Sequence, residues 1–362
     1  MHYIVGISFG FLLLQLIHVL LNLLFRQKIA HTQKALGEPV SILIPARNEE
    51  AHIGNLLRVL SKMKIEQAEI LVFDDQSNDN TAQIVTAFAQ KDSSIRLLQG
   101  GALPEGWLGK NHACYQLAQE AKGSYLLFLD ADVKIYGNIV ADAVAWLKKK
   151  RIGLLSVFPK QLQLTWGEKI TVPLMNYILI TLLPLIYVRL SPFRSHAAAN
   201  GQFMLFEAAN YKRLQPHLTC RQTAVEDVAI ARYYKRQKIK IACVTGLRRV
   251  QCRMYSSYHE ALNGFSKNIF AFFGNMPALA FLFWGFAALG WIPLAVAHAS
   301  YLPLWLLLVV LIQAGYALVS LQNPVTTVLL FPLQLLFMLH VMLKALIDKK
   351  RKTQRWKGRN IC

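Results

Sequence analysis

A short buried strand that ends in two carboxylates constrains this sequence most. Residues Tyr125–Leu129 are apolar or aromatic, and Asp130 and Asp132 follow them directly. Two carboxylates at the end of a buried strand are costly unless something neutralises them, and hard divalent cations do so together with phosphate oxygens. Ligands of open α/β sheets gather at the carboxyl ends of strands, so the pattern predicts a metal-bridged diphosphate site. The alternative is a solvated turn, because Asp-x-Asp alone often occurs by chance.

Composition limits the partners of the chain. Hydrophobic residues make up 54% of it, yet the formal net charge is +20. Both values fit if apolar segments lie in a bilayer and basic segments face its anionic leaflet. A basic chain also suits nucleic acid, but no basic-aromatic motif occurs, so we expect no nucleic-acid partner. The five cysteines are widely spaced and form no Cys-x-x-Cys pair, which favours reduced cytosolic thiols over a zinc site or disulfides.

The N-terminal segment has the composition of a membrane anchor. Residues 3–25 are a nearly unbroken apolar run without charge, and this length spans a bilayer. No basic segment precedes the run and no small-residue cleavage site follows it, so we expect an uncleaved anchor over residues 1–25. Arg26, Lys28 and Lys34 come next, and the positive-inside rule then puts the chain from residue 26 onward in the cytoplasm.

From Val40 the pattern becomes that of an α/β domain. Short β-branched or apolar runs alternate with helical stretches of ten to fifteen residues, which argues for a mainly parallel sheet covered on both faces. Three of the first four strands end in acidic, amide or hydroxyl residues, and a single nucleotide pocket explains all three. The predicted strands cover residues 40–44, 69–73, 95–98 and 125–129.

Two sets of motifs resemble a known family. The first set, in this order and spacing, resembles the family 2 glycosyltransferases of the GT-A fold: Val40–Glu50, Asp74-Asp75-x-Ser77-x-Asp79-x-Thr81 and Asp130-x-Asp132. The second set is similar to the membrane-bound branch that glycosylates carotenoid or hopanoid lipids, especially the diaponeurosporenoate glycosyltransferases. Its members are Ile44–Glu50, Trp107-x-Gly109-Lys110, Asn111–Gln116, Arg253-Met254-Tyr255 and Trp356–Arg359.

The resemblance implies an α/β fold with membrane helices at both ends. We expect a cytosolic GT-A nucleotide-sugar-binding domain with a Rossmann-like mixed sheet over residues 38–265. The N-terminal transmembrane helix precedes it, C-terminal transmembrane or interfacial helices over 266–348 follow it, and a basic tail over 349–362 ends the chain.

One apolar stretch, residues 166–190, interrupts the predicted domain. A true crossing there would separate the acidic pair Glu226-Asp227 from Asp132 and split the site. We therefore expect an amphipathic membrane-surface or re-entrant segment, with a buried pair of core helices as the alternative.

The number of C-terminal crossings follows from charge. Apolar segments lie at about 277–298, 302–321 and 325–346. Two crossings return the basic tail to the cytoplasm, and three leave it outside, against the positive-inside rule. We expect a cytosolic tail, with one segment re-entrant or interfacial. The chain is then a multi-pass plasma-membrane protein with a cytoplasmic catalytic domain.

The resemblance also assigns the donor side. Asp75 would contact the base and ribose of a UDP-sugar, since a carboxylate accepts from an imide or a hydroxyl. Asp132 would bind Mg²⁺ or Mn²⁺ at the diphosphate, and Asp130 would contact the ribose or act as support. Lys110, near a predicted helix start that favours an anion, would contact the diphosphate or base; a solvated lysine is the alternative. The other donor-side residues are Pro45, Ala46, Arg47, Glu49 and Arg253, the last of which would hold the diphosphate or position the acceptor.

On the acceptor side, Asp227 would be the general base, with Glu226 beside it and with Gly201 and Gln202 nearby. Attack opposite to the departing UDP inverts the anomeric carbon. Without the other motifs, a Glu-Asp pair is more often a charge pair at a helix start. An ionised carboxylic acid acceptor needs no base, so an aspartate here favours a hydroxyl acceptor.

The sequence therefore predicts an inverting, metal-dependent transferase that moves a hexose, first of all glucose, from UDP to a membrane lipid of terpenoid type. A polyprenyl phosphate, diacylglycerol or ceramide-like acceptor is the alternative, and a non-catalytic membrane protein that binds nucleotide sugars is another. The Arg253-Met254 pair departs from the Gln-x-x-Arg-Trp motif of processive polysaccharide synthases. The sugar, the lipid and the oligomeric state stay open.

Overall fold

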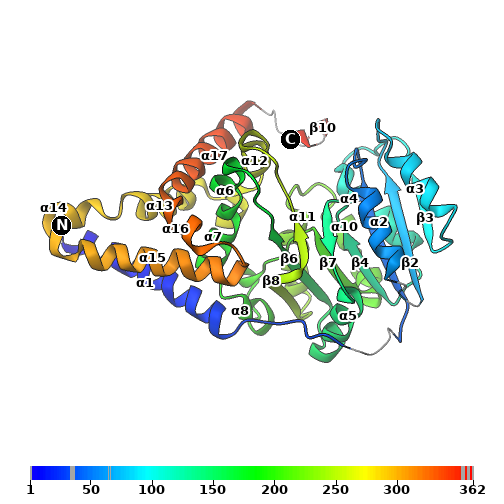
Figure 1. Cartoon of the computed structure of the whole chain (residues 1–362), viewed down its shortest axis with the longest axis horizontal. Helices are drawn as coiled ribbons and strands as arrows, with labels where there is room; N and C mark the ends of the chain where they lie inside the picture. Colours follow the sequence, from blue (N-terminus) through cyan, green and yellow to red (C-terminus); the bar gives the residue numbers. More distant parts are fainter. Residues whose placement is uncertain are drawn as a thin grey trace. The chain divides into compact units, whose positions relative to one another are not determined.

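The computed structural model describes residues 2–32, 37–63, 65, 67–351, 355–356 and 359–360 (Figure 1). Lys34 and much of the predicted basic tail lie outside the described residues. The chain forms two compact units, which we call the helical unit and the sheet unit. The helical unit comprises Met1–Arg26, Gln161–Leu185 and Arg253–Cys362, and the sheet unit comprises Gln27–Lys160 and Ile186–Cys252.

An eight-stranded mixed sheet forms the centre of the sheet unit, in the order β3-β2-β1-β4-β7-β6-β8-β5. β1 is parallel to β2 and β4, and β2 is parallel to β3, as the alternation of strands and helices predicts. β7 is antiparallel to β4 and β6, and β5 is antiparallel to β8. The strands are β1 (Val40–Ala46), β2 (Ala68–Asp74), β3 (Ile95–Gln99), β4 (Tyr125–Leu129), β5 (Val133–Ile135), β6 (Leu154–Gln161), β7 (Phe203–Glu207) and β8 (Ile241–Cys252).

Helices surround this sheet, and their apolar faces complete its core. All five residues of β4 are buried, as expected of a strand covered on both faces. Because β1, β2 and β4 run parallel, the residues that follow them meet at one edge of the sheet. The helices of this unit are α2 (Ile53–Lys62), α3 (Thr81–Ala89), α4 (Gly109–Glu120), α5 (Ile139–Lys150), α9 (Ala208–Leu214), α10 (Pro216–Thr219) and α11 (Glu226–Arg236).

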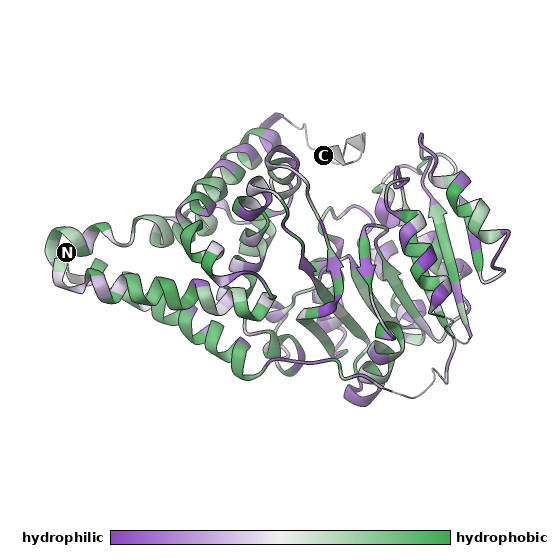
Figure 2. Cartoon of the chain, viewed as in Figure 1, coloured by the Kyte–Doolittle hydropathy of each residue, from purple (hydrophilic) through white to green (hydrophobic). Residues whose placement is uncertain are grey.

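The helical unit is mostly apolar along its length (Figure 2). Three of its described helices are long and apolar enough to cross a membrane: Tyr3–Leu24, Ala299–Ser320 and Phe331–Arg351. Its helices are α1 (His2–Leu24), α6 (Trp166–Thr171), α7 (Pro173–Leu182), α12 (Tyr258–Phe265), α13 (Pro277–Leu289), α14 (Ile292–Ala297), α15 (Leu302–Ser320), α16 (Pro324–Leu329) and α17 (Phe331–Arg351), and α8 (Leu185–Leu190) leads from it into the sheet unit.

The first of the three predicted C-terminal segments, 277–298, is not one helix. It is divided into α13 and α14 near Gly290, where a Cβ atom would lie 2.6 Å from the Ser8 hydroxyl of α1. The Ser8 hydroxyl donates to the Gly290 carbonyl over 2.8 Å. This segment is therefore the one of the three in which no helix reaches span length.

The predicted membrane-surface or re-entrant segment, residues 166–190, contains α7 as its longest helix. Eight of the ten residues of α7 are buried, and the helix packs against α1 and α15. The sequence of α7 has no charged residue to expose, which agrees with this burial. Its position relative to a membrane stays a prediction.

The compact units differ from the predicted domain 38–265 in two segments. Residues of α7 and α12 share one apolar cluster with α1, α13, α15 and α17. Their apolar side chains therefore group residues 161–185 and 253–265 with the helical unit.

Candidate active site

The donor-side residues predicted after β1 and β2 lie together. Arg47 donates through Nη1 to the backbone carbonyl of Asp75 and, over 3.3 Å, to that of Gln76. Its guanidinium is 4.0 Å from the Asp75 carboxylate. The Asp75 N–H donates to the Ala46 carbonyl over 2.8 Å, next to Pro45 in β1. Four predicted donor-side residues thus lie together at one edge of the sheet: Pro45, Ala46, Arg47 and Asp75.

The Asp-rich turn after β2 holds the neighbouring loop in place. Thr81 Oγ1 accepts from the Glu49 N–H over 2.8 Å, and Asp79 Oδ2 accepts from the Glu50 N–H over 3.0 Å. Ser77 Oγ accepts from the Asn48 N–H over 2.9 Å. These motif residues therefore join the loop after β1 to the loop after β2.

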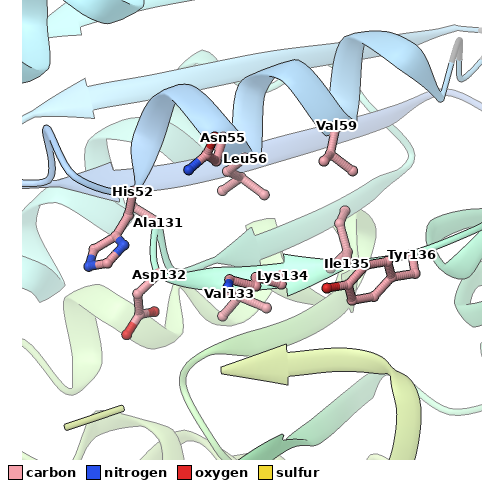
Figure 3. A pocket seen from close by; sticks show the side chains of 10 residues that line it. All are labelled: His52, Asn55, Leu56, Val59, Ala131, Asp132, Val133, Lys134, Ile135 and Tyr136. Carbon is pink, nitrogen blue, oxygen red and sulfur yellow. The ribbon is translucent and has the colours of Figure 1, made fainter. Parts of the chain in front are cut away.

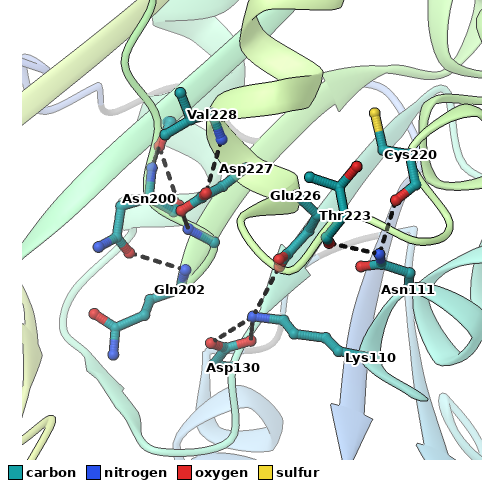
Figure 4. A network of polar contacts seen from close by, with 12 residues as sticks. Lys110, Asn111, Asp130, Asn200, Gln202, Cys220, Thr223, Glu226, Asp227 and Val228 are labelled. Carbon is teal, nitrogen blue, oxygen red and sulfur yellow. Dashed lines mark hydrogen bonds and ion pairs between the residues drawn. The ribbon is translucent and has the colours of Figure 1, made fainter. Parts of the chain in front are cut away.

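Lys110 joins the Asp-x-Asp pair to the Glu-Asp pair (Figure 4). Its ammonium nitrogen lies 2.9 Å from both carboxylate oxygens of Asp130 and 3.4 Å from Glu226 Oε1. Burial works against the charged form, but the carboxylates of Asp130 and Glu226 hold the pKa of Lys110 well above its ordinary value. Lys110 is therefore a charged bridge between two acidic residues, not a solvated lysine.

Asp227 is held at the start of α11. Its Oδ2 accepts from the Gly201 N–H over 3.0 Å, and its Oδ1 accepts from the Val228 N–H over 2.7 Å (Figure 4). Burial and then the charge of Glu226 raise the pKa of Asp227 to about 7, although both hydrogen bonds oppose the shift. A carboxylate with such a pKa takes up a proton near neutral pH, as a general base must.

Gly201 allows its backbone to approach this cluster closely. A Cβ atom there would lie 3.1 Å from the Lys110 nitrogen and 3.2 Å from Glu226 Oε1. The neighbouring Gln202 accepts from the Asp130 N–H over 3.2 Å through its backbone carbonyl. Both predicted acceptor-side residues thus border the cluster of Lys110, Asp130, Glu226 and Asp227.

Asp132 has the chemistry of a cation ligand. Its Oδ2 accepts from the Cys252 thiol over 3.4 Å, while its Oδ1 is buried without a hydrogen-bond partner in the described part of the chain. Burial, followed by the charges of Asp130 and Glu49, raises the pKa of Asp132 to about 7. Residues 2–32, 37–63, 65 and 67–351 contain no group of three His, Cys, Asp or Glu side chains that could hold a metal. A divalent cation at Asp132 would thus need most of its ligands from phosphate and water.

A pocket of about 210 Å³ lies beside Asp132, between α2 and β5 (Figure 3). Its wall combines apolar side chains with polar ones. The lining residues are His52, Asn55, Leu56, Val59, Ala131, Asp132, Val133, Lys134, Ile135 and Tyr136. No residue of α2 was a predicted site residue, because its helical pattern indicates only packing.

Comparisons with known proteins agree with this geometry. A family model described as Glycosyl transferase family 2 matches residues 41–189. This segment is a family 2 glycosyltransferase domain. The predicted family resemblance is thereby confirmed.

The GT-A fold of this glycosyltransferase domain is confirmed by a solved structure. A mannosyltransferase from Pyrobaculum calidifontis, in complex with GDP-Man and Mn²⁺, covers 96% of the chain with a TM-score of 0.61 and 17% sequence identity. The match extends over 98% of that protein.

Two curated relatives carry the same name. A 4,4'-diaponeurosporenoate glycosyltransferase from Staphylococcus haemolyticus is 26% identical over 67% of this chain and 65% of its own. One from Staphylococcus aureus (strain USA300) is 27% identical over 64% of this chain and 60% of its own. The match thus spans less than two thirds of the length of these relatives.

Arg253 belongs to the helical unit, whereas most of the residues that the family model matches lie in the sheet unit. Its Nε and Nη2 donate to Glu168 Oε1 over 3.0 and 2.6 Å. Glu168 is fully buried and completes a capping box with Thr165 at the start of α6. The predicted contact of Arg253 with a diphosphate stays a prediction.

Two residues near the site were not predicted from sequence. Asn111 donates through Nδ2 to the carbonyls of Cys220 (2.9 Å) and Thr223 (3.1 Å), and so fixes the loop that precedes the Glu-Asp pair. Cys252 contacts Asp132. Asn111 could have been predicted, because it follows Lys110 within a motif. Nothing in the sequence distinguishes Cys252 from the other cysteines.

Proposed function

We propose that this chain is a membrane-associated inverting glycosyltransferase that transfers a hexose from a UDP-sugar to a lipid. The observation that supports this most is the bridge of Lys110 between Asp130 and Glu226. It places the acidic end of β4 and the start of α11 around one polar cluster inside the sheet unit, which holds most of the residues that the family 2 glycosyltransferase model matches. A donor at β4 and a base at α11 are what one-step transfer requires.

On the donor side, Asp75 accepts from the uracil imide or a ribose hydroxyl, and Arg47 holds the loop that carries Asp75. Asp132 Oδ1 is the ligand for Mg²⁺ or Mn²⁺, which fits its burial without a partner. The bound cation supplies positive charge at the diphosphate and at the departing UDP. The mannosyltransferase of similar fold contains Mn²⁺, which favours the same class of cation here.

In the transfer step, an acceptor oxygen forms a bond to the anomeric carbon as the bond from that carbon to the UDP oxygen breaks. Asp227 accepts the proton of the acceptor hydroxyl, and UDP leaves with the bonding electron pair. The hydrogen bonds from Gly201 and Val228 fix the carboxylate that receives this proton. Attack from the face opposite UDP inverts the configuration.

A lipid acceptor is supported by the names of the relatives and by the helical unit. Both relatives are named for a carotenoid acid, diaponeurosporenoate, and three helices have the length and composition of membrane spans. A terpenoid is therefore our first acceptor. We place the sheet unit in the cytoplasm and the helical unit in the plasma membrane as a multi-pass anchor.

The test is release of UDP by the purified protein in detergent. UDP-glucose with Mn²⁺ or Mg²⁺ is supplied, and terpenoid, polyprenyl phosphate, diacylglycerol and ceramide lipids are added one class at a time. Lipid-dependent release that EDTA abolishes is the expected result. GDP-mannose serves as the comparison donor, because the solved structure of similar fold contains it. Absence of any nucleotide binding would refute the proposal.

A further inference from the structure

A buried thiol contacts the carboxylate that we assign to the cation. Cys252, the last residue of β8, is fully buried, and its Sγ lies 3.4 Å from Asp132 Oδ2. The register of the sheet explains the contact, since Cys252 is paired with Val133, the residue after Asp132. The thiol therefore approaches Asp132 from the neighbouring strand and not from the local sequence.

The thiol is itself held by an amide. Gln202 Nε2 donates to Cys252 Sγ over 2.8 Å, and Gln202 is almost entirely buried. The bonds run in one direction: the amide donates to sulfur, and the S–H donates to the carboxylate. A carboxylate with one oxygen fixed in this way has a defined rotation, which leaves Oδ1 as its remaining oxygen.

The backbone around Gln202 is fixed as well. Its N–H donates to Asn200 Oδ1 over 2.9 Å, and its carbonyl accepts from the Asp130 N–H over 3.2 Å. The preceding N–H, that of Gly201, donates to Asp227. Residues 200–202 thus connect the strand end that carries Asp132 with the carboxylate of Asp227.

We propose that Cys252 and Gln202 are positioning residues that orient the Asp132 carboxylate so that Oδ1 binds the divalent cation. The inference rests on the proposed function and deepens it, because it assigns Gln202 to the metal side instead of the acceptor side. Groups that hydrogen-bond a metal ligand orient it, and their loss typically weakens metal binding by about 10- to 100-fold. The thiol acts as a hydrogen-bond donor to the ligand and not as a ligand.

The experiment measures Mn²⁺ binding by the full-length protein in detergent with UDP present, from the EPR signal of free Mn²⁺. Cys252→Ala should weaken Mn²⁺ binding by about tenfold, whereas Cys252→Ser, which keeps a donor, should stay within about threefold of the wild type. Gln202→Leu acts on the same contact without changing the thiol and should also weaken binding. Cys243→Ala removes another fully buried thiol from β8 and should leave Mn²⁺ affinity unchanged.

Each outcome decides the inference. Equal affinity in Cys252→Ala and wild type would overturn it, and so would a loss in Cys252→Ser as large as in Cys252→Ala, because the thiol would then act by packing or as a ligand. If Cys252→Ala does not fold, the Mn²⁺ affinity of Gln202→Leu tests the inference instead, and an affinity equal to that of the wild type would overturn it. A wild type that binds UDP but no Mn²⁺ would overturn the cation role of Asp132 together with this inference, whereas normal binding with unaffected variants would overturn the inference alone.

Discussion

The ammonium nitrogen of Lys110 lies 2.9 Å from the carboxylate of Asp130, which joins the start of α4 to the end of β4. Lys110→Met would leave Asp130 and Glu226 without their common counter-charge. We expect kcat/KM for the donor to fall by more than about tenfold and folding stability to fall by about 1–3 kcal/mol. Lys110→Arg should retain more of both.

The measurement for Lys110 is steady-state UDP release together with thermal unfolding in detergent. Lys149→Met removes a positive charge at the exposed end of α5 and serves as the matched control. Wild-type kinetics in Lys110→Met would show that the bridge has no role in transfer.

The pH profile tests Asp227 as the base. Its pKa is raised to about 7, so the carboxyl is protonated and inactive as a base below that pH. Activity with a hydroxyl acceptor should therefore rise with pH through about 7 and level off above it. Asp227→Asn should lower kcat by about 100-fold or more and remove this rise, with donor binding little changed.

A carboxylic acid acceptor should give a different pH profile. A carboxylic acid acceptor is ionised well below neutral pH and needs no proton acceptor. A pH profile that is flat around 7, with full activity in Asp227→Asn, would assign the protein to an acceptor of that kind. Loss of donor binding in Asp227→Asn would instead contradict its placement on the acceptor side.

Removal of the cation should act through Asp132. EDTA should abolish turnover, and added Mn²⁺ or Mg²⁺ should restore it. Asp132→Asn should abolish turnover at every cation concentration while the protein keeps its melting temperature, because Oδ1 has no protein partner to lose in the described part of the chain. Turnover by Asp132→Asn without added metal would contradict the assignment. Asp348→Asn, on α17 of the helical unit, is a control for loss of a carboxylate.

The parallel half of the sheet could be predicted because its signals are local. β1, β2, β3 and β4 each show a short apolar run, and the residues after three of them are polar. The antiparallel half could not be predicted in the same way. β7 is paired with β4, from which it is separated by more than seventy residues, and no feature of either strand specifies the other.

The candidate site residues could likewise be predicted from local motifs, whereas their partners could not. Asp75, Asp132 and Asp227 belong to motifs that can be recognised in a single sequence. The partners that give them their chemistry come from distant segments, as with Cys252 beside Asp132 and Gly201 beside Asp227. The partner of Arg253 is a similar case, because no sequence pattern indicated its ion pair with Glu168.

The N-terminal helix α1 is expected to stabilise the helical unit and not only to anchor it. Asn22 donates through Nδ2 to the carbonyls of Ile180 and Leu183 over 3.0 Å, and its Oδ1 accepts from the Leu185 N–H over 2.7 Å. These groups lie where Pro184 ends the helical pattern, and unpaired backbone groups are costly in apolar surroundings.

Asn22→Leu should therefore lower the melting temperature of the detergent-solubilised protein, by a loss of about 0.6–2 kcal/mol. Leu14→Ala is the matched control, because Leu14 lies on the same helix with half of its side chain exposed and should leave the melting temperature nearly unchanged. Equal melting temperatures for wild type and Asn22→Leu would mean that the backbone at Pro184 finds other partners. A shift for Asn22→Leu alone would show that α1 is part of the folded unit.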